Sequence, residues 1–285
     1  MFNILPSIKT AIILLIIGLV LASLTAAGVM FFSPTLIGIT SVQMGLLIGE
    51  LFLPLPIYLW AKKNGANLCK LFRINYVPWR AVTAAIPLSL GLTIIIDELD
   101  RFAQTLASTP LEFSKIQEIV TISNPLSAVF IIGVVVIIAP LVEELVFRGF
   151  LQRILEYRIR DVTKAVLYSA LIFAFIHFNP WWIVQIYIIG VFMGYVAWRT
   201  NSIWISFVIH AINNGVAILF SHLADGTMGW YEWKGYVSPI ILFAGILLLF
   251  GGMYWFRRNT PTYDRRTEFL LIEDQSDNQP KTGNE

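Results

Sequence analysis

The sequence predicts an all-α, polytopic membrane protein with about eight transmembrane helices. Hydrophobic residues make up 57% of its 285 residues and charged residues only 13%, whereas soluble domains carry about 25% charged residues. The mean hydropathy is +0.73. The apolar stretches are much longer than the strands of a membrane β-barrel and show no alternation with period two, so helices are the expected spanning elements.

The first apolar stretch, 11–32, follows Lys9 and could be taken for a secretory signal. Its length argues against a signal, because the apolar part of a signal runs about 7 to 15 residues whereas a spanning helix needs about 20. We therefore expect a retained first helix. The remaining spans are expected at 36–60, 81–97, 126–147, 163–178, 183–198, 203–220 and 237–256.

These spans predict one membrane-embedded domain, 1–256, with its polar motifs concentrated in a core at 126–220. The tail, 257–285, is polar and has no helical period, and we expect it to be a disordered cytoplasmic segment. The single cysteine, Cys69, excludes an internal disulfide and a cysteine-based metal cage.

Basic residues predict the orientation. Segments 61–80 and 148–164 each contain five Lys or Arg residues, whereas the short loop 33–35 contains none. Basic loops face the cytoplasm, and eight spans then place both termini there. We expect a multi-pass integral membrane protein in contact with membrane lipid, in the plasma membrane if the source is bacterial. Nucleic acid is not an expected partner, because the basic residues cluster between apolar stretches rather than on one face.

Three charged residues, Glu143, Glu144 and Arg148, directly follow the apolar run 128–142. A charge at membrane depth costs about 2.5 to 3.5 kcal/mol even on lenient scales, so a paired or functional role is expected. Neighbours on a helix point about 100° apart, whereas residues four apart share a face. We therefore expect Glu144 to pair with Arg148 and Glu143 to project elsewhere. The alternative is a single structural cluster of all three.

His177 lies four residues after Phe173 in a later apolar stretch. An antiparallel helical hairpin turning near 160–161 would put Glu143 and His177 both about 25 Å from the turn, at about 1.5 Å per residue. The helix that carries Glu143 must then continue to about Arg158. A carboxylate beside an imidazole can hold and deprotonate a water. The alternative is a packed histidine that bonds between helices.

His210 and Asn214 also lie four residues apart and share a helical face. Their donors could stabilise the oxyanion of a tetrahedral intermediate, where each good donor is worth about 2.7 to 4 kcal/mol. Asn213 is also within reach, and spacing alone does not choose between the two asparagines. The structural alternative is a polar clamp between helices. Glu50, in the second span, is expected to pair or to line a cavity.

These three patterns, in this order on expected membrane helices, resemble the CAAX-processing and bacteriocin-processing family of intramembrane proteases. The eukaryotic CAAX prenyl endopeptidase and bacterial Abi-type proteins are members of that family. The resemblance covers roughly 126–220. The matching residues are Glu143, Glu144 and Arg148 (EExxxR), Phe173 and His177 (FxxxH), and His210 and Asn214 (HxxxN).

The resemblance implies an endopeptidase in which Glu143 and His177 activate a water. It also implies that His210 and Asn214, rather than Asn213, stabilise the oxyanion. The other residues of the patterns would order the site and tune it electrostatically. The implied substrate is a peptide or protein, prenylated in the eukaryotic relatives, whereas bacterial relatives include proteins with peptide-maturation or immunity roles.

No cofactor is expected. The alternative is a catalytic zinc held by Glu143, His177 and His210 with an open fourth position. The chain has no HExxH motif, which would put two histidines and a base on one helical face, and we therefore favour a metal-free glutamate mechanism.

Two other functional classes are compatible with polar residues at membrane depth. A transporter or channel would be favoured by inverted repeats or by matched broken half-helices, and the sequence shows neither. A non-catalytic immunity or binding protein is disfavoured by the intact set of polar residues.

Overall fold

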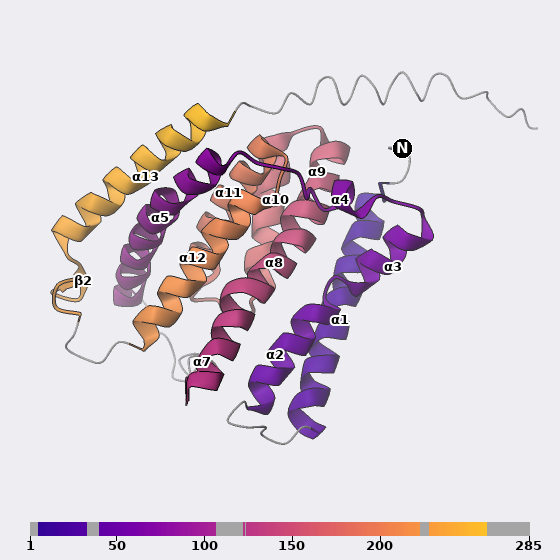
Figure 1. Cartoon of the computed structure of the whole chain (residues 1–285), viewed down its shortest axis with the longest axis horizontal. Helices are drawn as coiled ribbons and strands as arrows, with labels where there is room; N and C mark the ends of the chain where they lie inside the picture. The colour runs from indigo at the N-terminus through magenta and orange to yellow at the C-terminus, as the bar shows by residue number, and fades with distance from the viewer. Residues whose placement is uncertain (1–4, 33–39, 107–121, 123, 223–227, 261–285) are drawn as a thin grey trace, which may run out of the picture.

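The computed structural model describes residues 5–32, 40–106, 122, 124–222 and 228–260. In this part of the chain the fold is all-α apart from one short β-hairpin, as predicted (Figure 1). The elements in chain order are α1 (Ile8–Phe32), α2 (Ser41–Phe52), α3 (Leu55–Lys63), α4 (Leu68–Leu71), α5 (Trp79–Leu106), α7 (Pro125–Ile131), η3 (Ile132–Ile138), α8 (Ala139–Glu144), η4 (Leu145–Leu151), α9 (Gln152–Ile159), α10 (Val162–Phe175), α11 (Ile183–Thr200), α12 (Trp204–Ser221), β1 (Glu232–Trp233), β2 (Tyr236–Val237) and α13 (Pro239–Asn259).

Seven helical segments of the described chain are long and apolar enough to cross a membrane. Two of them are composite: α2 and α3 form one, and the continuous run from α7 to α9 forms another. The remaining expected span, 163–178, corresponds to α10, which has 14 residues and is about 21 Å long. That is shorter than a hydrocarbon core of about 30 Å. The chain is a multi-pass integral membrane protein with close to the eight spans expected.

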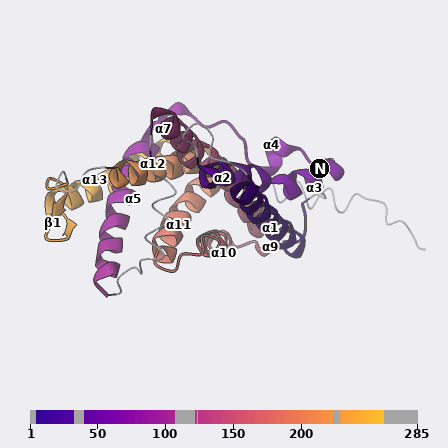
Figure 2. The ribbon, with the colours of Figure 1, turned by 90° about the horizontal axis from the view of Figure 1, so that it is seen from below.

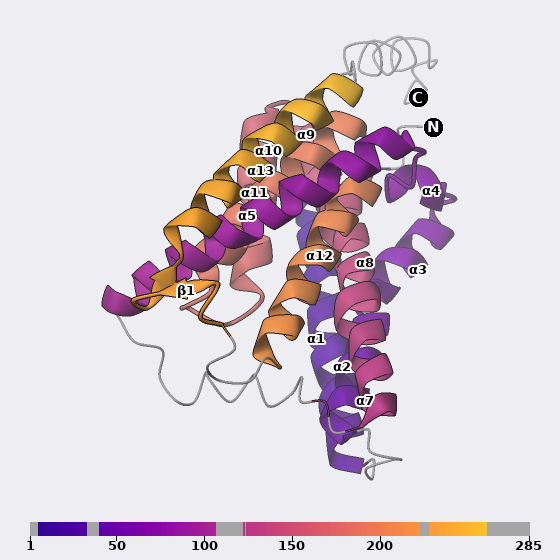
Figure 3. The ribbon, with the colours of Figure 1, turned by 60° about the vertical axis from the view of Figure 1, so that its left-hand side comes forward.

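The helices form a broad bundle. In Figures 1, 2 and 3, α1 lies beside α2 at one edge, α5 lies beside α13 at the other, and α8, α10, α11 and α12 lie between them. Glycines allow the edge pairs to approach closely. A Cβ on Gly91 of α5 would lie 2.4 Å from the backbone nitrogen of Leu249 on α13.

The second span is broken near its middle. It begins at a capping box, in which the Thr40 side chain accepts from the Gln43 amide and the Gln43 side chain accepts from the Thr40 amide. It is interrupted at Leu53 and Pro54. Proline has no amide proton and its ring crowds the preceding turn, which explains the interruption. Lys62 lies at the end of α3, before the loop that leads to α5.

The helical run from α7 to α9 has 35 residues and continues to Ile159, as the predicted hairpin requires. Two of its sections, η3 and η4, have π-helical turns, which occur often at functional sites. The run ends at Arg160, whose φ of 57° is left-handed, and Asp161 caps α10. The Lys164 amide donates to the Asp161 carboxylate and lowers the pKa of that carboxyl. The predicted hairpin at 160–161 is therefore confirmed.

The last described segment consists of a β-hairpin, which contacts α5, and the helix α13. A two-stranded antiparallel hairpin, β1 and β2, precedes α13, and it turns at Lys234 and Gly235, both with positive φ. The Tyr231 hydroxyl donates to Asp97 of α5 at 2.8 Å. Burial of the ring, together with the charge of Asp97, raises the pKa of Tyr231. The last helix, α13, reaches Asn259, and most of the expected tail, 257–285, lies outside the described residues.

Candidate active site

The two adjacent glutamates have different surroundings. Glu144 is completely buried, and Arg148 Nη1 donates a hydrogen bond of 2.7 Å to its Oε1. This is the pairing that the four-residue spacing predicts. Only 14% of the Glu143 side chain is exposed, and its buried Oε2 has no hydrogen-bond partner among the described residues. Glu144 Oε2 likewise has no hydrogen-bond partner in this part of the chain, so the two carboxylates differ in exposure and in that Glu144 alone is bound to Arg148.

His210, on α12, lies between the two glutamates. Its Nδ1 is 3.2 Å from Glu144 Oε1, and its Nε2 is 3.7 Å from Glu143 Oε2. Because a carboxylate faces each ring nitrogen, the orientation of the ring is fixed from both sides. Glu144 Oε1 is shared between His210 and Arg148, so these residues form one connected cluster.

Arg148 also contacts residues of α10 and α11. Its Cζ lies 4.1 Å from the ring centroid of Phe173, a cation–π contact. Its Nη2 donates to the Gly190 carbonyl at 3.4 Å. A Cβ on Gly190 would lie 3.2 Å from the Cβ of Ala170, so the glycine lets α11 approach α10 closely. The Phe173 ring also meets the His210 ring edge to face, with centroids 5.7 Å apart.

His177 lies in the turn after α10 and not within the helix, so the expected helical end at 178 is wrong. The helix ends at Phe175, and Phe178 has a left-handed φ of 50°, a common way to end a helix. The last carbonyls of a helix lack amide partners, and His177 Nδ1 lies 2.7 Å from the Phe173 carbonyl oxygen. Because a carbonyl only accepts, Nδ1 carries the proton, and the neutral ring has its lone pair on Nε2.

The hairpin brings His177 to the site through Phe173. The ring centroids of Phe173 and His177 are 4.8 Å apart, in an edge-to-face arrangement. Among the described residues, the side chain that pairs with Glu143 is His210, and no contact joins Glu143 directly to His177. The joint action of Glu143 and His177 on a water therefore stays a prediction.

The two asparagines of α12 face different neighbours. Asn214 Nδ2 donates to the Val135 carbonyl in η3 at 3.0 Å. Asn213 Oδ1 accepts from the Thr93 hydroxyl of α5 at 3.3 Å. Asn214 is therefore directed at the helical run that carries the glutamates, whereas Asn213 binds another helix. The second proton on Asn214 Nδ2 remains for a further acceptor.

Glu50, on α2, adds a third carboxylate near the cluster. Its Oε2 is buried and has no hydrogen-bond partner among the described residues, as is true of Glu143 Oε2. The charge of Glu143 acts on Glu50, and α2 packs against α8. The sequence predicts that Glu50 pairs or lines a cavity. No hydrogen-bond partner is found for its Oε2 in the described chain, and the cavity stays a prediction.

Sequence reasoning missed two polar residues that continue the same helical face. Gln152 and Glu156 follow Glu144 and Arg148 at four-residue intervals, and both are buried. Gln152 Nε2 donates to Glu156 Oε1 at 2.7 Å and to the Gly194 carbonyl at 2.9 Å. The regular spacing was visible in the sequence, so the polar row could have been found there.

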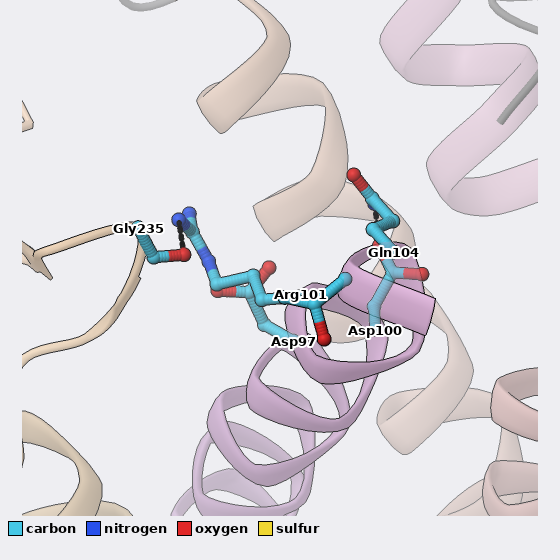
Figure 4. A pocket seen from close by; sticks show the side chains of 6 residues that line it. Asp97, Asp100, Arg101, Gln104 and Gly235 are labelled. Atoms are coloured by element: carbon cyan, nitrogen blue, oxygen red, sulfur yellow. Dashed lines mark hydrogen bonds and ion pairs between the residues drawn. The ribbon is translucent and has the colours of Figure 1, made fainter. Parts of the chain in front are cut away.

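A separate polar pocket of about 390 Å³ lies at the end of α5 (Figure 4). It contains none of the candidate catalytic residues. Its charged groups already have partners: Arg101 Nε donates to Asp97 at 2.9 Å, and Gln104 donates to Asp100 at 2.7 Å. The pocket is therefore not the candidate active site. Its lining residues are Asp97, Asp100, Arg101, Gln104, Thr105 and Gly235.

In the part of the chain that the structure describes, no three His, Cys, Asp or Glu side chains are grouped so as to hold a metal ion. In the zinc alternative the ligands are Glu143, His177 and His210. Nδ1 of His210 faces Glu144, and Nδ1 of His177 faces a backbone carbonyl, so each ring would have to bind through Nε2. The zinc alternative stays a prediction.

The fold and this cluster define a polytopic membrane protein with a buried Glu–Arg–His site among its helices. Residues 125–216 match the family described as "Type II CAAX prenyl endopeptidase Rce1-like", and this match confirms the resemblance to the CAAX-processing family. The matched segment runs from α7 into α12 and contains every residue of the three patterns. No curated protein and no solved structure matches the chain. The family implies a peptidase that acts on a peptide or protein in the membrane.

Proposed function

We propose that the protein is an intramembrane endopeptidase of the glutamate type. The observation that carries the proposal is that Glu143 is partly exposed and is not bound to Arg148, and that its Oε2 has no hydrogen-bond partner among the described residues, whereas the neighbouring Glu144 is completely buried and paired with Arg148. A base has to have a free lone pair within reach of the proton it removes. In the described structure both glutamates have an Oε2 without a hydrogen-bond partner. Glu144 is completely buried and bound to Arg148 and His210 through Oε1, whereas Glu143 is partly exposed, so Glu143 is the more accessible base.

In the proposed reaction a water attacks the carbonyl carbon of the scissile peptide bond. Glu143 takes one proton of the water. The other proton of the water is donated in a hydrogen bond to His177 Nε2. The negative charge then develops on the carbonyl oxygen. The proton returns from Glu143 to the amide nitrogen as the C–N bond breaks, which leaves a carboxylic acid and an amine.

The proposed oxyanion donors are His210 Nε2–H and Asn214 Nδ2–H. His210 already faces Glu144 through Nδ1, so donation from Nε2 requires both ring nitrogens to carry protons. Asn214 is held by the Val135 carbonyl and keeps its second proton for the substrate. Glu144, Arg148 and Phe173 would orient the histidine.

The first experiment compares membrane peptides, by mass spectrometry, from cells with the wild-type protein and with Glu143→Gln. We expect peptides that depend on the wild type and disappear with the variant, while both proteins reach the membrane in equal amounts. The control is Glu232→Gln, which changes an exposed carboxylate on β1 and should leave the profile unchanged. Identical profiles for wild type and Glu143→Gln would favour a non-catalytic protein.

The substrate class and the metal question need the purified protein. The probe is a fluorogenic peptide in which a farnesylated cysteine is followed by three C-terminal residues. It is compared with the same peptide without the lipid. We propose that the lipidated form is cleaved faster. Excess chelator should leave cleavage intact, and a loss that zinc restores would favour the zinc alternative.

A further inference from the structure

A short loop outside the family match contacts both helices that carry the candidate catalytic residues. It consists of residues 73–75, between α4 and α5, and we call it the 73–75 loop. Arg73 is completely buried and has a left-handed φ of 54°. A buried arginine is expensive unless it is paired. Its partners therefore indicate what the loop is for.

On one side the loop holds the helical run that carries the glutamates. The Arg73 guanidinium forms a two-point ion pair with Glu156 of α9, with Nη1 at 3.2 Å from Oε1 and Nη2 bonded to Oε2. Arg73 Nη1 also donates to the Arg148 carbonyl at 3.3 Å. Arg148 is the residue that pairs with Glu144. The loop thus fixes the backbone one helical turn from the candidate site.

On the other side the loop holds the beginning of α12, which carries His210. The Ile203 amide donates to the Arg73 carbonyl at 3.2 Å. Asn75 Nδ2 donates to the Asn201 carbonyl at 2.6 Å, and the Ser202 hydroxyl donates to the Asn75 carbonyl at 2.8 Å. Three hydrogen bonds therefore attach the loop to residues just before the first turn of α12.

We propose that Arg73 is a positioning residue that sets the separation between the glutamates and His210. Through one residue, the loop joins the two helices whose side chains meet at 3.2 Å and 3.7 Å in the site. A shift of one helix against the other would change both distances together, and a misplacement of about 1 Å can cost about 100-fold in rate. This inference rests on the proposed function, because it assumes that the glutamates and His210 act together.

The test measures kcat, KM and thermal stability of the full-length protein in detergent, with the farnesylated fluorogenic peptide as the probe. The variant Glu156→Gln keeps the shape of the side chain but removes the charge opposite Arg73. We expect kcat per folded molecule to fall at least tenfold while KM changes less than twofold. The pH profile of kcat should also shift, because the distances between His210 and the glutamates change.

The matched control is Arg199→Lys. Arg199 also joins two helix ends, since its side chain donates to the Thr260 hydroxyl at 3.1 Å and to the Arg257 carbonyl at 3.2 Å. Those bonds link α11 to the end of α13 and do not involve the glutamates or His210. We expect this variant to lower thermal stability with kcat per folded molecule unchanged.

A milder variant covers the case in which Glu156→Gln does not fold. Ser202→Ala removes the hydrogen bond that the hydroxyl donates to the Asn75 carbonyl, together with the long one of 3.4 Å that it accepts from the Trp204 amide, and we expect a threefold to tenfold loss of kcat. Unchanged kcat and pH profile in a folded Glu156→Gln or Ser202→Ala would overturn the inference. Retained cleavage by Glu143→Gln in the same assay would instead refute the proposed function itself, so the two failures are distinguishable.

Discussion

At the scale of single residues, two adjacent glutamates in the membrane domain have different partners. Glu144 shares Oε1 between Arg148 and His210, whereas the charged partner of Glu143 in the described chain is His210 alone, at 3.7 Å; the Oε2 of each glutamate has no hydrogen-bond partner among the described residues. A buried charge with a partner contributes to the fold, and a buried charge without one is retained at a cost in stability. The two glutamates should therefore respond differently to the same substitution.

The variant Glu144→Gln should destabilise the protein more than Glu143→Gln. Removing one member of a buried ion pair leaves the other charge uncompensated and typically costs about 3 to 5 kcal/mol. In Glu144→Gln, the buried Arg148 guanidinium would be left without a compensating negative charge. Thermal unfolding in detergent should show a much larger fall for Glu144→Gln, while Glu143→Gln should unfold near the wild-type temperature and lack activity. Equal shifts for the two variants would mean that they share one structural role.

The variant Glu50→Gln should stabilise the protein. The carboxylate of Glu50 has an unsatisfied buried oxygen and feels the like charge of Glu143. The amide has nearly the same shape, carries no charge and can donate a hydrogen bond. An unsatisfied buried polar group costs about 1 to 3 kcal/mol, so the unfolding midpoint should rise. A clear fall in the midpoint would indicate that the Glu50 charge is paired in the folded protein.

At the scale of elements, the site is built where helices end or change their turn. Asn214 is bonded to a carbonyl of the π-helical section η3, and His177 is bonded to a carbonyl near the end of α10. The hairpin at 160–161 could be predicted because both arms have helical patterns and because Glu143 and His177 lie nearly equally far from it along the chain. The end of α10 and the π-helical turns could not, because they depend on which side chains satisfy particular carbonyls in the folded molecule.

The burial of Arg73 also could not be predicted from the local sequence. Its position in a basic loop predicts a surface residue, whereas the structure buries it against Glu156. Local patterns therefore predicted the helices and the Glu144–Arg148 pair, which lie within one segment. They could not predict contacts between segments more than 60 residues apart, such as those of His210 with the two glutamates.

Close contact of the long helix with Phe72, the residue directly before the 73–75 loop, predicts a sensitive glycine. A Cβ on Gly149 would lie 2.6 Å from the Phe72 carbonyl oxygen, which belongs to the backbone and cannot move alone. We therefore expect Gly149→Ala to cost about 1 to 3 kcal/mol, the usual effect of overpacking, and to lower cleavage by displacing the 73–75 loop. The measurements are thermal unfolding and kcat.

The control for this glycine is Gly251→Ala on α13, where a Cβ would meet nothing within 4 Å. Alanine is the better helix former, so this variant should be neutral or slightly stabilising. If both glycine variants behaved alike, close packing against Phe72 would not be the cause of the effect at Gly149.

At the scale of the whole molecule, the arrangement of helices predicts which ends face the cytoplasm. The basic loop that contains α4 and the β-hairpin before α13 lie at opposite ends of the bundle (Figure 1). Basic loops face the cytoplasm, so α4 is expected inside and the hairpin outside. The candidate site lies between these ends, with the 73–75 loop on the α4 side. In the expected orientation, the 73–75 loop therefore lies on the cytoplasmic side of the candidate site.

Cysteine labelling can test this orientation directly. Cys69 is the only cysteine of the chain, and it is exposed on α4. A membrane-impermeant maleimide should leave it unlabelled in intact cells and label it after permeabilisation. In the reverse control, Lys234→Cys combined with Cys69→Ser places the only thiol on the β-hairpin, and intact cells should label it. Labelling of Cys69 in intact cells would invert the topology, and both termini would then be expected outside, because the eight expected spans put both termini on the same side as α4.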